Sequence, residues 1–162
     1  MAKKGDEKTN VMRLLEQKKI PYQSYDYSHT DAVSGVEVAN ALGEDPAQVF
    51  KTLVTIGKSG KNYVFVIPVA EELNLKKAAV AVSEKKIEMI KQKELLGLTG
   101  YIHGGCSPIG MKKPFPTVMH ESCLSYDTVM VSAGKIGFQV QIAPKALENF
   151  VPFSTADIVG EE

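Results

Sequence analysis

The sequence predicts an α+β domain with a mixed, mostly antiparallel sheet and flanking helices. Three observations favour this class: strand-like segments come in neighbouring pairs, helix signals stand between them without strict alternation, and no repeat or flexible linker divides the chain. The 162 residues and the hydrophobic content of 44% suit one domain with a sizeable core. We expect residues 1–8 to be frayed and the domain to span residues 9–160.

The chain is expected to begin with a helix and a short strand. Thr9 or Asn10 can cap a helix whose apolar side chains fall on one side, and Pro21 closes it. The aromatic segment over residues 22–27 is typical of a strand.

The next two elements carry the strongest local signals. Ser34 and Glu37 have capping-box spacing at the start of an apolar helix, which Gly43 ends. Residues 49–56 and 63–69 are rich in β-branched side chains, and a Lys-Ser-Gly-Lys turn lies between them. This arrangement predicts a β-hairpin.

The second half of the chain is expected to hold shorter elements. Ser83 is placed to cap the second of three helices, and Gly97 to stop the third. The expected helices span residues 74–82, 83–91, 92–96 and 145–150, and the expected strands span 101–103, 117–120, 128–132 and 138–142.

Charge and composition exclude several classes of function. The 19 basic and 19 acidic residues cancel, so no molecule-wide field attracts nucleic acid and any RNA contact must come from a local patch. The polar N-terminus is no signal peptide, and the apolar run over residues 63–70 is too short to span a bilayer. Two cysteines are too few for a secreted disulfide scaffold. We expect a cytoplasmic protein with free thiols and with neither a membrane nor DNA as a partner.

A glycine-rich stretch, Gly-Gly-Cys-Ser-Pro-Ile-Gly over residues 104–110, is the most unusual part of the sequence. The adjacent Gly104 and Gly105 let the backbone approach a ligand and aim its N–H groups at it, as in an oxyanion hole. The stretch lacks the Gly-Lys-Ser/Thr ending of a P-loop and does not fit a dinucleotide-binding fingerprint. The alternative is a tight connection between two strands.

Lysines form the second group of interest. Period-two alternation places Lys51 on the same strand face as Val49 and Leu53. Lys51 is therefore either an edge-strand charge that prevents aggregation or a buried, functional ammonium. Lys112 and Lys113 follow the glycine-rich stretch directly, which makes them the better candidates for phosphate contacts among the remaining lysines.

Two His-x-x-Cys pairs offer further chemistry. His103 with Cys106 and His120 with Cys123 are either a zinc set or buried thiols beside polar strand residues. A cysteine nucleophile also needs an oriented base, and no acidic residue can be assigned to orient either histidine. We expect neither a metal nor a cofactor.

The combination of motifs resembles the YbaK/EbsC family over roughly residues 11–159. A Lys-Thr-Leu strand and a Gly-Gly-x-Ser-Pro-x-Gly loop are specific when they occur together. The segments that carry the resemblance are, in order, Phe50 to Leu53, Leu73 to Ala79, Gly104 to Gly110, and Ser132 to Lys135 continuing through Ile142-Ala143-Pro144.

The resemblance implies a fold and an activity. Members are related to the editing domain of bacterial prolyl-tRNA synthetases, and the implied fold is a mixed sheet curled into a barrel-like body. The implied activity is trans-editing: the YbaK type clears cysteine from tRNA(Pro), and relatives clear alanine. The implied partners are aminoacyl-tRNA and prolyl-tRNA synthetase. A deacylase for alanine and a non-catalytic, tRNA-binding or regulatory module are the alternatives.

The resemblance also implies roles for individual residues. Lys51 matches the functional lysine of the family, and Gly104 and Gly105 match its loop backbone. Gln139 is a departure, because some relatives carry a carboxylate there, and Cys106 falls on a variable position. The implied substrate-binding residues are Tyr25, Thr52, Ser107, Pro108 and Gln139.

In the implied mechanism, the thiol of the substrate cysteine attacks the ester carbonyl, and the protein positions the reactants and stabilises charge. The backbone N–H groups near Gly104 and Gly105 then hold the carbonyl. Lys51 anchors the terminal phosphate or ribose of the tRNA.

Overall fold

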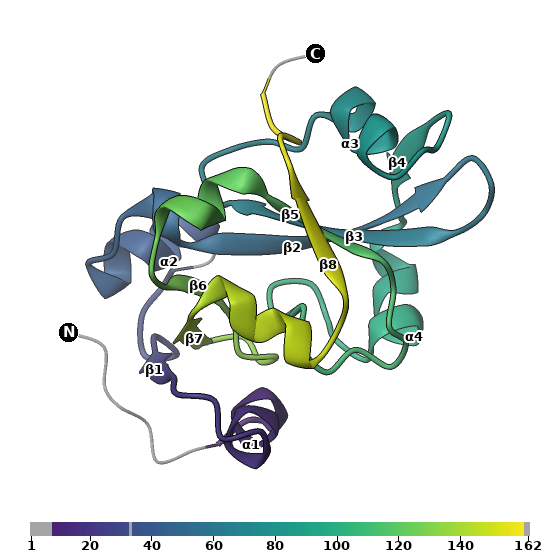
Figure 1. The fold of residues 1–162 in the computed structure, drawn as a ribbon. Coiled ribbons are helices and arrows are strands. Elements are labelled where there is room, and N and C mark those ends of the chain that lie inside the picture. The colour runs from purple at the N-terminus through teal and green to yellow at the C-terminus, as the bar shows by residue number, and fades with distance from the viewer. Residues whose placement is uncertain (1–7, 33, 161–162) are drawn as a thin grey trace.

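The computed structural model describes residues 8–32 and 34–160 (Figure 1). Residues 1–7 of the expected frayed segment lie outside the described residues. The helices are α1 (Asn10–Gln17), α2 (Gly35–Leu42), α3 (Leu75–Ala81) and α4 (Leu95–Thr99), with 3-10 turns η1 (Pro46–Gln48), η2 (Gln92–Glu94), η3 (Glu121–Ser125) and η4 (Pro144–Asn149). The strands are β1 (Gln23–Asp26), β2 (Phe50–Gly57), β3 (Asn62–Pro68), β4 (Ile87–Met89), β5 (Thr117–His120), β6 (Val129–Ser132), β7 (Phe138–Ile142) and β8 (Phe153–Ala156).

The strands form two sheets. One has the order β1-β7-β6 and the other β4-β2-β3-β5-β8. The β3–β5 and β5–β8 pairings are parallel and the four others are antiparallel, so the predicted mixed, mostly antiparallel pairing is confirmed. The two described sheets remain separate and do not close into the expected barrel.

The β2–β3 hairpin is the centre of the molecule and is buried on both faces. Val64 and Val66 face the three-stranded sheet and join the larger core. Phe65 and Ile67 point the other way and pack with Ala78 of α3. A strand buried on both faces needs a continuous apolar run rather than alternation, which is what residues 63–67 provide.

Local capping signals are confirmed. The Thr9 hydroxyl accepts a hydrogen bond from the Met12 amide at the start of α1. The capping box of Ser34 and Glu37 starts α2, and Gly43 ends it in the left-handed conformation with φ 69°. Each signal depends on neighbours in sequence only, and this is why the sequence predicts it well.

Several expectations for the second half are wrong. The expected helix over residues 83–91 is replaced by β4, since Ser83 takes a positive φ of 60° and the chain then pairs with β2. The expected strand at 101–103 is a loop, and the expected helix over 145–150 is the 3-10 turn η4. In place of the helix expected over residues 92–96, the chain forms η2 and then α4, which passes Gly97 and ends at Gly100. Strand β8 had no counterpart among the expected elements.

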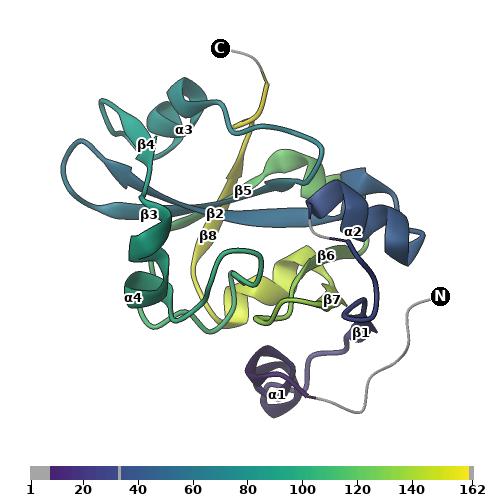
Figure 2. The same ribbon diagram turned by 180° about the vertical axis from the view of Figure 1, so that it is seen from behind.

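One edge of β2 is left partly open. β4 pairs with β2 only over Thr55–Gly57, and at the other end Val49 bridges Met130 of β6. Between these contacts, residues 51–53 pair with β3 alone. Helices α2 and α4 lie at opposite ends of this stretch (Figure 2). The gap is therefore lined by elements that are distant in sequence.

No helix in the described ranges is both long enough and apolar enough to span a membrane.

Truncation of the hairpin core should destabilise the protein strongly. Phe65 is fully buried, so Phe65→Ala is expected to lower the free energy of unfolding by about 3–5 kcal/mol. Val80→Ala is the control, because Val80 is 81% exposed and a change within about 0.5 kcal/mol is expected. Urea unfolding followed by circular dichroism measures both. Equal midpoints for the two variants would contradict the central position of the hairpin.

Candidate functional site

A cavity of about 220 Å³ opens at the unpaired edge of β2. Its walls come from β2, α2, the loop before Cys106, the first residue of α4, and the paired strands β6 and β7. Four of the predicted site residues line it together: Lys51, Thr52, Gly104 and Gln139. They come from three separate parts of the chain, so the fold brings the predicted motifs to one place.

Among the described residues that line this cavity, Lys51 is the only lysine or arginine. Its side chain is partly buried, and this desolvation lowers the pKa of the ammonium below its usual value, while the charge of Glu72 acts in the opposite direction. Lys51 is thus a desolvated lysine on an inner strand, at the stretch of β2 that β4 leaves unpaired. An ammonium in such a place interacts more strongly with an anionic or polar ligand than a solvated one does.

Two neutral oxygens in the cavity lining have no hydrogen-bond partner. Thr52 Oγ1 and Gln139 Oε1 are both inaccessible to solvent, and neither is bonded within the described chain. Gln139 is only 7% exposed. Buried polar atoms without partners cost stability, which makes such atoms candidates for contact with a ligand. The neutral amide of Gln139 also avoids placing a carboxylate in this buried position.

The glycine-rich loop approaches the turn after β6 very closely. Gly104 has a φ of 91°, and the Gly105 N–H donates to the Ile102 carbonyl at 3.0 Å, which closes a tight turn. A Cβ on Gly105 would lie 3.1 Å from the Ile136 backbone nitrogen. A side chain at position 105 would therefore crowd the backbone of Ile136, and the Gly105 N–H is already used inside the loop.

This hydrogen bond bears on the role expected for Gly105, because the Gly105 N–H is bonded within the loop. Gly105 is not among the residues that line the cavity, whereas Gly104 and Cys106 are. No described group accepts a hydrogen bond from the backbone N–H of Gly104 or Cys106. The N–H groups of Gly104 and Cys106 are therefore the loop's candidate donors to a ligand.

Ser107 and Pro108 shape the loop rather than line the cavity. Ser107 is fully buried, and its hydroxyl accepts a hydrogen bond from the Ile109 N–H at 3.2 Å. Pro108 is buried and borders a different hollow, which it shares with Lys113. These two predicted substrate-binding residues are thus buried parts of the loop that do not line the cavity.

The tyrosine that lines the cavity is Tyr27. Tyr25, the predicted one, lies outside the lining, and its hydroxyl donates to Gln141 Oε1 at 2.7 Å. Tyr27 is 5% exposed, and its N–H donates to the Gly137 carbonyl at 2.7 Å. The sequence signal was ambiguous, because the two tyrosines are two positions apart and the chain leaves β1 between them.

Other lining residues were not predicted from sequence. Ser132 lines the cavity beside Gln139, its partner in the β6–β7 register. Its hydroxyl accepts a hydrogen bond from the Gly134 N–H at 3.1 Å. Ser34 and Val38 of α2 and Leu95 of α4 also contribute. The capping motif located Ser34, but no local pattern shows which elements meet in space.

Lys112 and Lys113 are exposed and stand outside the cavity. The Lys112 N–H donates to the Thr99 carbonyl at 3.0 Å, and its side chain crosses Gly100 at the end of α4. Because both residues are exposed, their ammonium groups are accessible to phosphates.

Neither cysteine is prepared for nucleophilic attack. Burial raises the pKa of the Cys106 thiol to about 12 and that of Cys123 to about 11. Both thiols therefore stay protonated at neutral pH. The two His-x-x-Cys pairs do not assemble either: His103 lines the cavity, His120 lines another hollow, and no group of three potential ligands gathers in the described residues.

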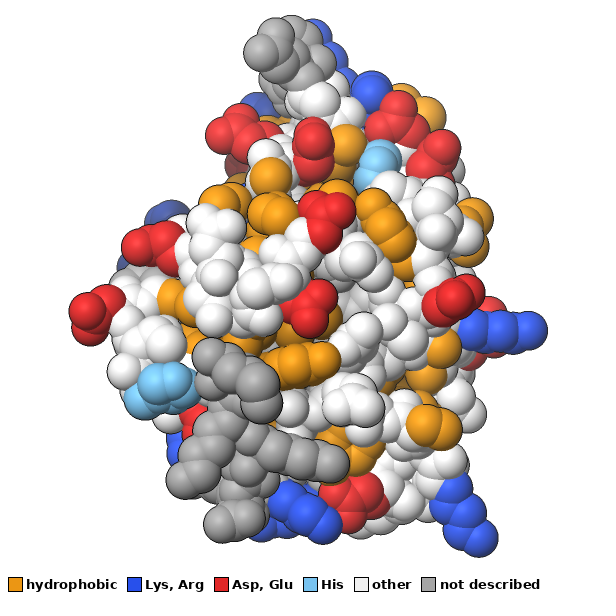
Figure 3. Space-filling model, turned by 90° about the vertical axis from the view of Figure 1, so that its left-hand side faces the viewer, with side chains coloured by type: hydrophobic (Ala, Val, Ile, Leu, Met, Phe, Trp, Pro, Cys, Tyr) orange, Lys and Arg blue, Asp and Glu red, His pale blue; other side chains and the backbone are white. Residues whose placement is uncertain are grey.

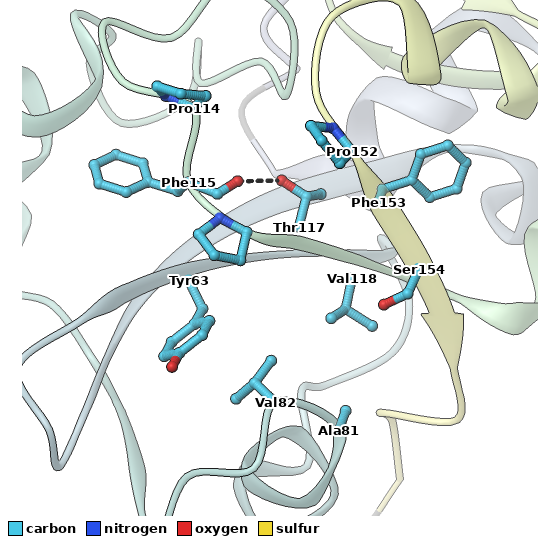
Figure 4. A pocket seen from close by; sticks show the side chains of 11 residues that line it. Tyr63, Ala81, Val82, Pro114, Phe115, Thr117, Val118, Pro152, Phe153 and Ser154 are labelled. Atoms are coloured by element: carbon cyan, nitrogen blue, oxygen red, sulfur yellow. Dashed lines mark hydrogen bonds between the residues drawn. The ribbon is translucent and has the colours of Figure 1, made fainter.

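A larger hollow of about 520 Å³ lies between α3, β5 and β8 (Figure 4). Proline and aromatic side chains dominate its lining, among them Phe115, Pro152 and Phe153. Its ionisable group, Tyr63, donates its hydroxyl hydrogen to Glu84 at 2.7 Å. The smaller cavity is therefore the better candidate for chemistry, since it contains the desolvated lysine and the unpartnered oxygens.

Comparison with known proteins identifies the family. The family profile described as the aminoacyl-tRNA editing domain matches residues 29–150. The chain belongs to the aminoacyl-tRNA editing domain family. The matched segment includes Lys51, the glycine-rich loop and Gln139, whereas Tyr27 lies just before it.

This editing domain also resembles individual proteins along its length. It is 47% identical to a candidate Cys-tRNA(Pro)/Cys-tRNA(Cys) deacylase, EbsC, of Enterococcus faecalis (strain ATCC 700802 / V583), with 99% of this chain and 98% of the relative covered. The crystal structure of a candidate trans-editing enzyme for prolyl-tRNA synthetase is 27% identical, with a TM-score of 0.79 over 93% of this chain and 95% of that one. The hypothetical protein APE2540, 21% identical with a TM-score of 0.82 over 94% and 100% of the two chains, shares the fold.

Gly105→Ala should be destabilising because the added methyl group meets fixed backbone. The Cβ contact at 3.1 Å involves the backbone of Ile136, so a loss of about 1–3 kcal/mol in the free energy of unfolding is expected. Gly97→Ala in α4 is the matched control, since nothing lies within 4 Å of its Cβ and a gain of about 0.5–1 kcal/mol is expected. Thermal unfolding compares them; a stabilising Gly105→Ala would show that the loop does not need this approach.

Proposed function

We propose that this protein hydrolyses the ester bond of mischarged aminoacyl-tRNA, with cysteinyl-tRNA(Pro) as its substrate. The observation that carries the proposal is the composition of the cavity, in which one desolvated lysine and two unpartnered neutral oxygens surround a space without a reactive protein nucleophile. The identity to a candidate Cys-tRNA(Pro)/Cys-tRNA(Cys) deacylase supports the choice of substrate.

The size of the cavity suits a small aminoacyl group. Its volume of about 220 Å³ is below the range of about 300–1,000 Å³ that is usual for drug-sized ligands. A cysteinyl or alanyl group linked to the terminal ribose fits this description better than a large aromatic group. The open side at the mouth lets the rest of the tRNA remain outside.

The reaction is substrate-assisted. The sulfur of the substrate cysteine bonds to the ester carbonyl carbon, the bond from that carbon to the ribose oxygen breaks, and the thiol proton ends on the ribose oxygen. The products are intact tRNA and a cyclic thioester, which water opens to free cysteine. The N–H groups of Gly104 and Cys106 stabilise the negative charge that develops on the carbonyl oxygen.

The remaining polar groups position the substrate. Lys51 binds the terminal phosphate or ribose, and this contact places the ester above the loop. Gln139 Oε1 and Thr52 Oγ1 accept hydrogen bonds from the substrate, which gives these buried oxygens the partners they lack in the protein. Positioning of this kind accounts for several kcal/mol of barrier reduction without a protein nucleophile.

The whole of residues 9–160 acts as one deacylase domain in the cytoplasm under this proposal. Prolyl-tRNA synthetase is the proposed second partner, because it generates the mischarged tRNA on which the domain acts.

Lys51→Ala should abolish deacylation while the fold remains intact. Loss of the substrate contact is expected to lower kcat/KM for cysteinyl-tRNA(Pro) by about 100- to 1,000-fold. Lys58→Ala is the control on the same hairpin, since Lys58 is exposed and outside the cavity, and it should retain full activity. Release of labelled cysteine measures the rates, and circular dichroism checks the fold. A fully active Lys51→Ala variant would remove Lys51 from the mechanism.

Cys106→Ala should keep most of the activity. Because the pKa of the Cys106 thiol is raised to about 12, the protein thiol is protonated at neutral pH and is not the attacking group. We expect the deacylation rate to stay within about threefold of the wild type, as loss of a buried sulfur alters packing only slightly. An inactive variant with a normal thermal midpoint would place the nucleophile on the protein.

A further inference from the structure

Charge is distributed unequally along this neutral chain. Residues 20–50 contain five carboxylates and no lysine or arginine, whereas residues 91–113 contain four lysines and one glutamate. The first segment forms α2 and its flanks, and the second forms η2, α4 and the glycine-rich loop. Helices α2 and α4 line the cavity from opposite ends (Figure 2). We call the surface beside α2 the acidic approach to the cavity and the surface beside α4 the opposite approach, which is basic.

The acidic approach is visible on the side of the molecule where α2 lies. There, acidic side chains are spread over the face and basic side chains stay at its margins (Figure 3). Exposed charges interact over a Debye length of about 8 Å at physiological salt, so the local sign decides how a polyanion approaches even though the net charge is zero. A phosphate backbone is repelled from this approach.

The opposite approach has both charged and apolar groups. Lys91 and Lys93 stand just before α4. Lys112 stands at its far end, where its N–H donates to the Thr99 carbonyl, and Lys113 follows Lys112 and borders the neighbouring hollow with Leu14 and Pro108. Within the described ranges, none of the four ammonium nitrogens lies within 4.0 Å of a carboxylate oxygen, although the backbone N–H of Lys91 donates to Glu94 Oε1 at 3.3 Å. Two aliphatic side chains lie in the same segment and are unusually exposed: Leu96 at 54% and Ile102 at 53%.

We propose that this α4 surface, made of Lys91, Lys93, Leu96, Ile102, Lys112 and Lys113, binds the acceptor end of the tRNA. The four ammonium groups contact phosphates, and the two aliphatic side chains cover bases of the unpaired 3′ end. Leu95, the neighbour of Leu96, lines the cavity, so a strand bound on this surface reaches the cavity directly. The tRNA therefore enters past α4 and stays away from α2. This inference rests on the proposed function for the identity of the RNA.

Binding of uncharged tRNA(Pro) at several salt concentrations tests the proposal. Lys91→Gln/Lys93→Gln and Lys112→Gln/Lys113→Gln should each weaken binding by about tenfold at low salt and reduce the magnitude of the salt slope by about one per lysine. The matched control is Lys18→Gln/Lys145→Gln, exposed lysines outside the cavity, which should leave the Kd and the slope near the wild-type values.

The aliphatic part of the surface has a separate readout. Leu96→Gln/Ile102→Gln should weaken binding several-fold with an unchanged salt slope, since no phosphate contact is lost. Wild-type affinity in all α4-surface variants, greater loss in the control, or no tRNA binding by the wild type would overturn the proposal. Circular dichroism on each variant excludes loss of fold as the cause.

The two proposals fail in different ways. Release of cysteine from cysteinyl-tRNA(Pro) is measured on the same wild-type preparation. If the wild type binds tRNA through α4 but releases no cysteine, the surface is supported and the deacylase proposal fails. If the wild type is active and KM is the same in every lysine variant, the deacylase proposal is supported and the surface is overturned.

Discussion

The site depends on incomplete pairing along one edge of β2. Strand β3 pairs with β2 from Phe50 to Ile56, but β4 pairs only with Thr55–Gly57, and β6 forms a single bridge to Val49, the residue before β2. The stretch between them is rigid, because β3 and the core fix it, and yet it is open to a ligand. Lys51 in this stretch is fixed by the backbone pairing with β3, but its side chain is only partly buried. A fully paired strand would not leave room for a ligand, and a free loop would not fix the lysine.

The chemistry of the cavity follows from how little charge it contains. Desolvation lowers the pKa of the Lys51 ammonium, and the oxygens of Thr52 and Gln139 are neutral. Burial disfavours the charged form of both groups. It therefore raises the pKa of the Cys106 thiol, which stays protonated, and lowers the pKa of the Lys51 ammonium. Such a site can bind and orient an ester, while the reactive thiol belongs to the substrate. The surface beside α2 is acidic and the surface beside α4 is basic, so a polyanion is expected to reach the cavity from the α4 side.

Much of the fold could be predicted from the sequence, because the decisive signals are local. The capping box at Ser34 and the hairpin around residues 58–61 need only neighbouring residues. Local propensity predicts a helix where β4 forms, because the pairing of β4 with β2 overrides that propensity. No local signal predicts β8, because it pairs in parallel with β5, which is far away in sequence. In the site, the motifs located Lys51 and the loop. They did not distinguish Tyr27 from Tyr25 or show that the Gly105 N–H is used internally.

A crystal structure with a non-hydrolysable analogue, in which cysteine is joined to the 3′ position of adenosine by an amide, would show whether the substrate binds at the open edge of β2. We expect the analogue to lie there, with its carbonyl oxygen about 3 Å from the backbone nitrogens of Gly104 and Cys106 and with Lys51 against its ribose. An analogue bound in the proline- and aromatic-lined hollow beside β8, or one bound at β2 without contact to Lys51, would contradict this expectation.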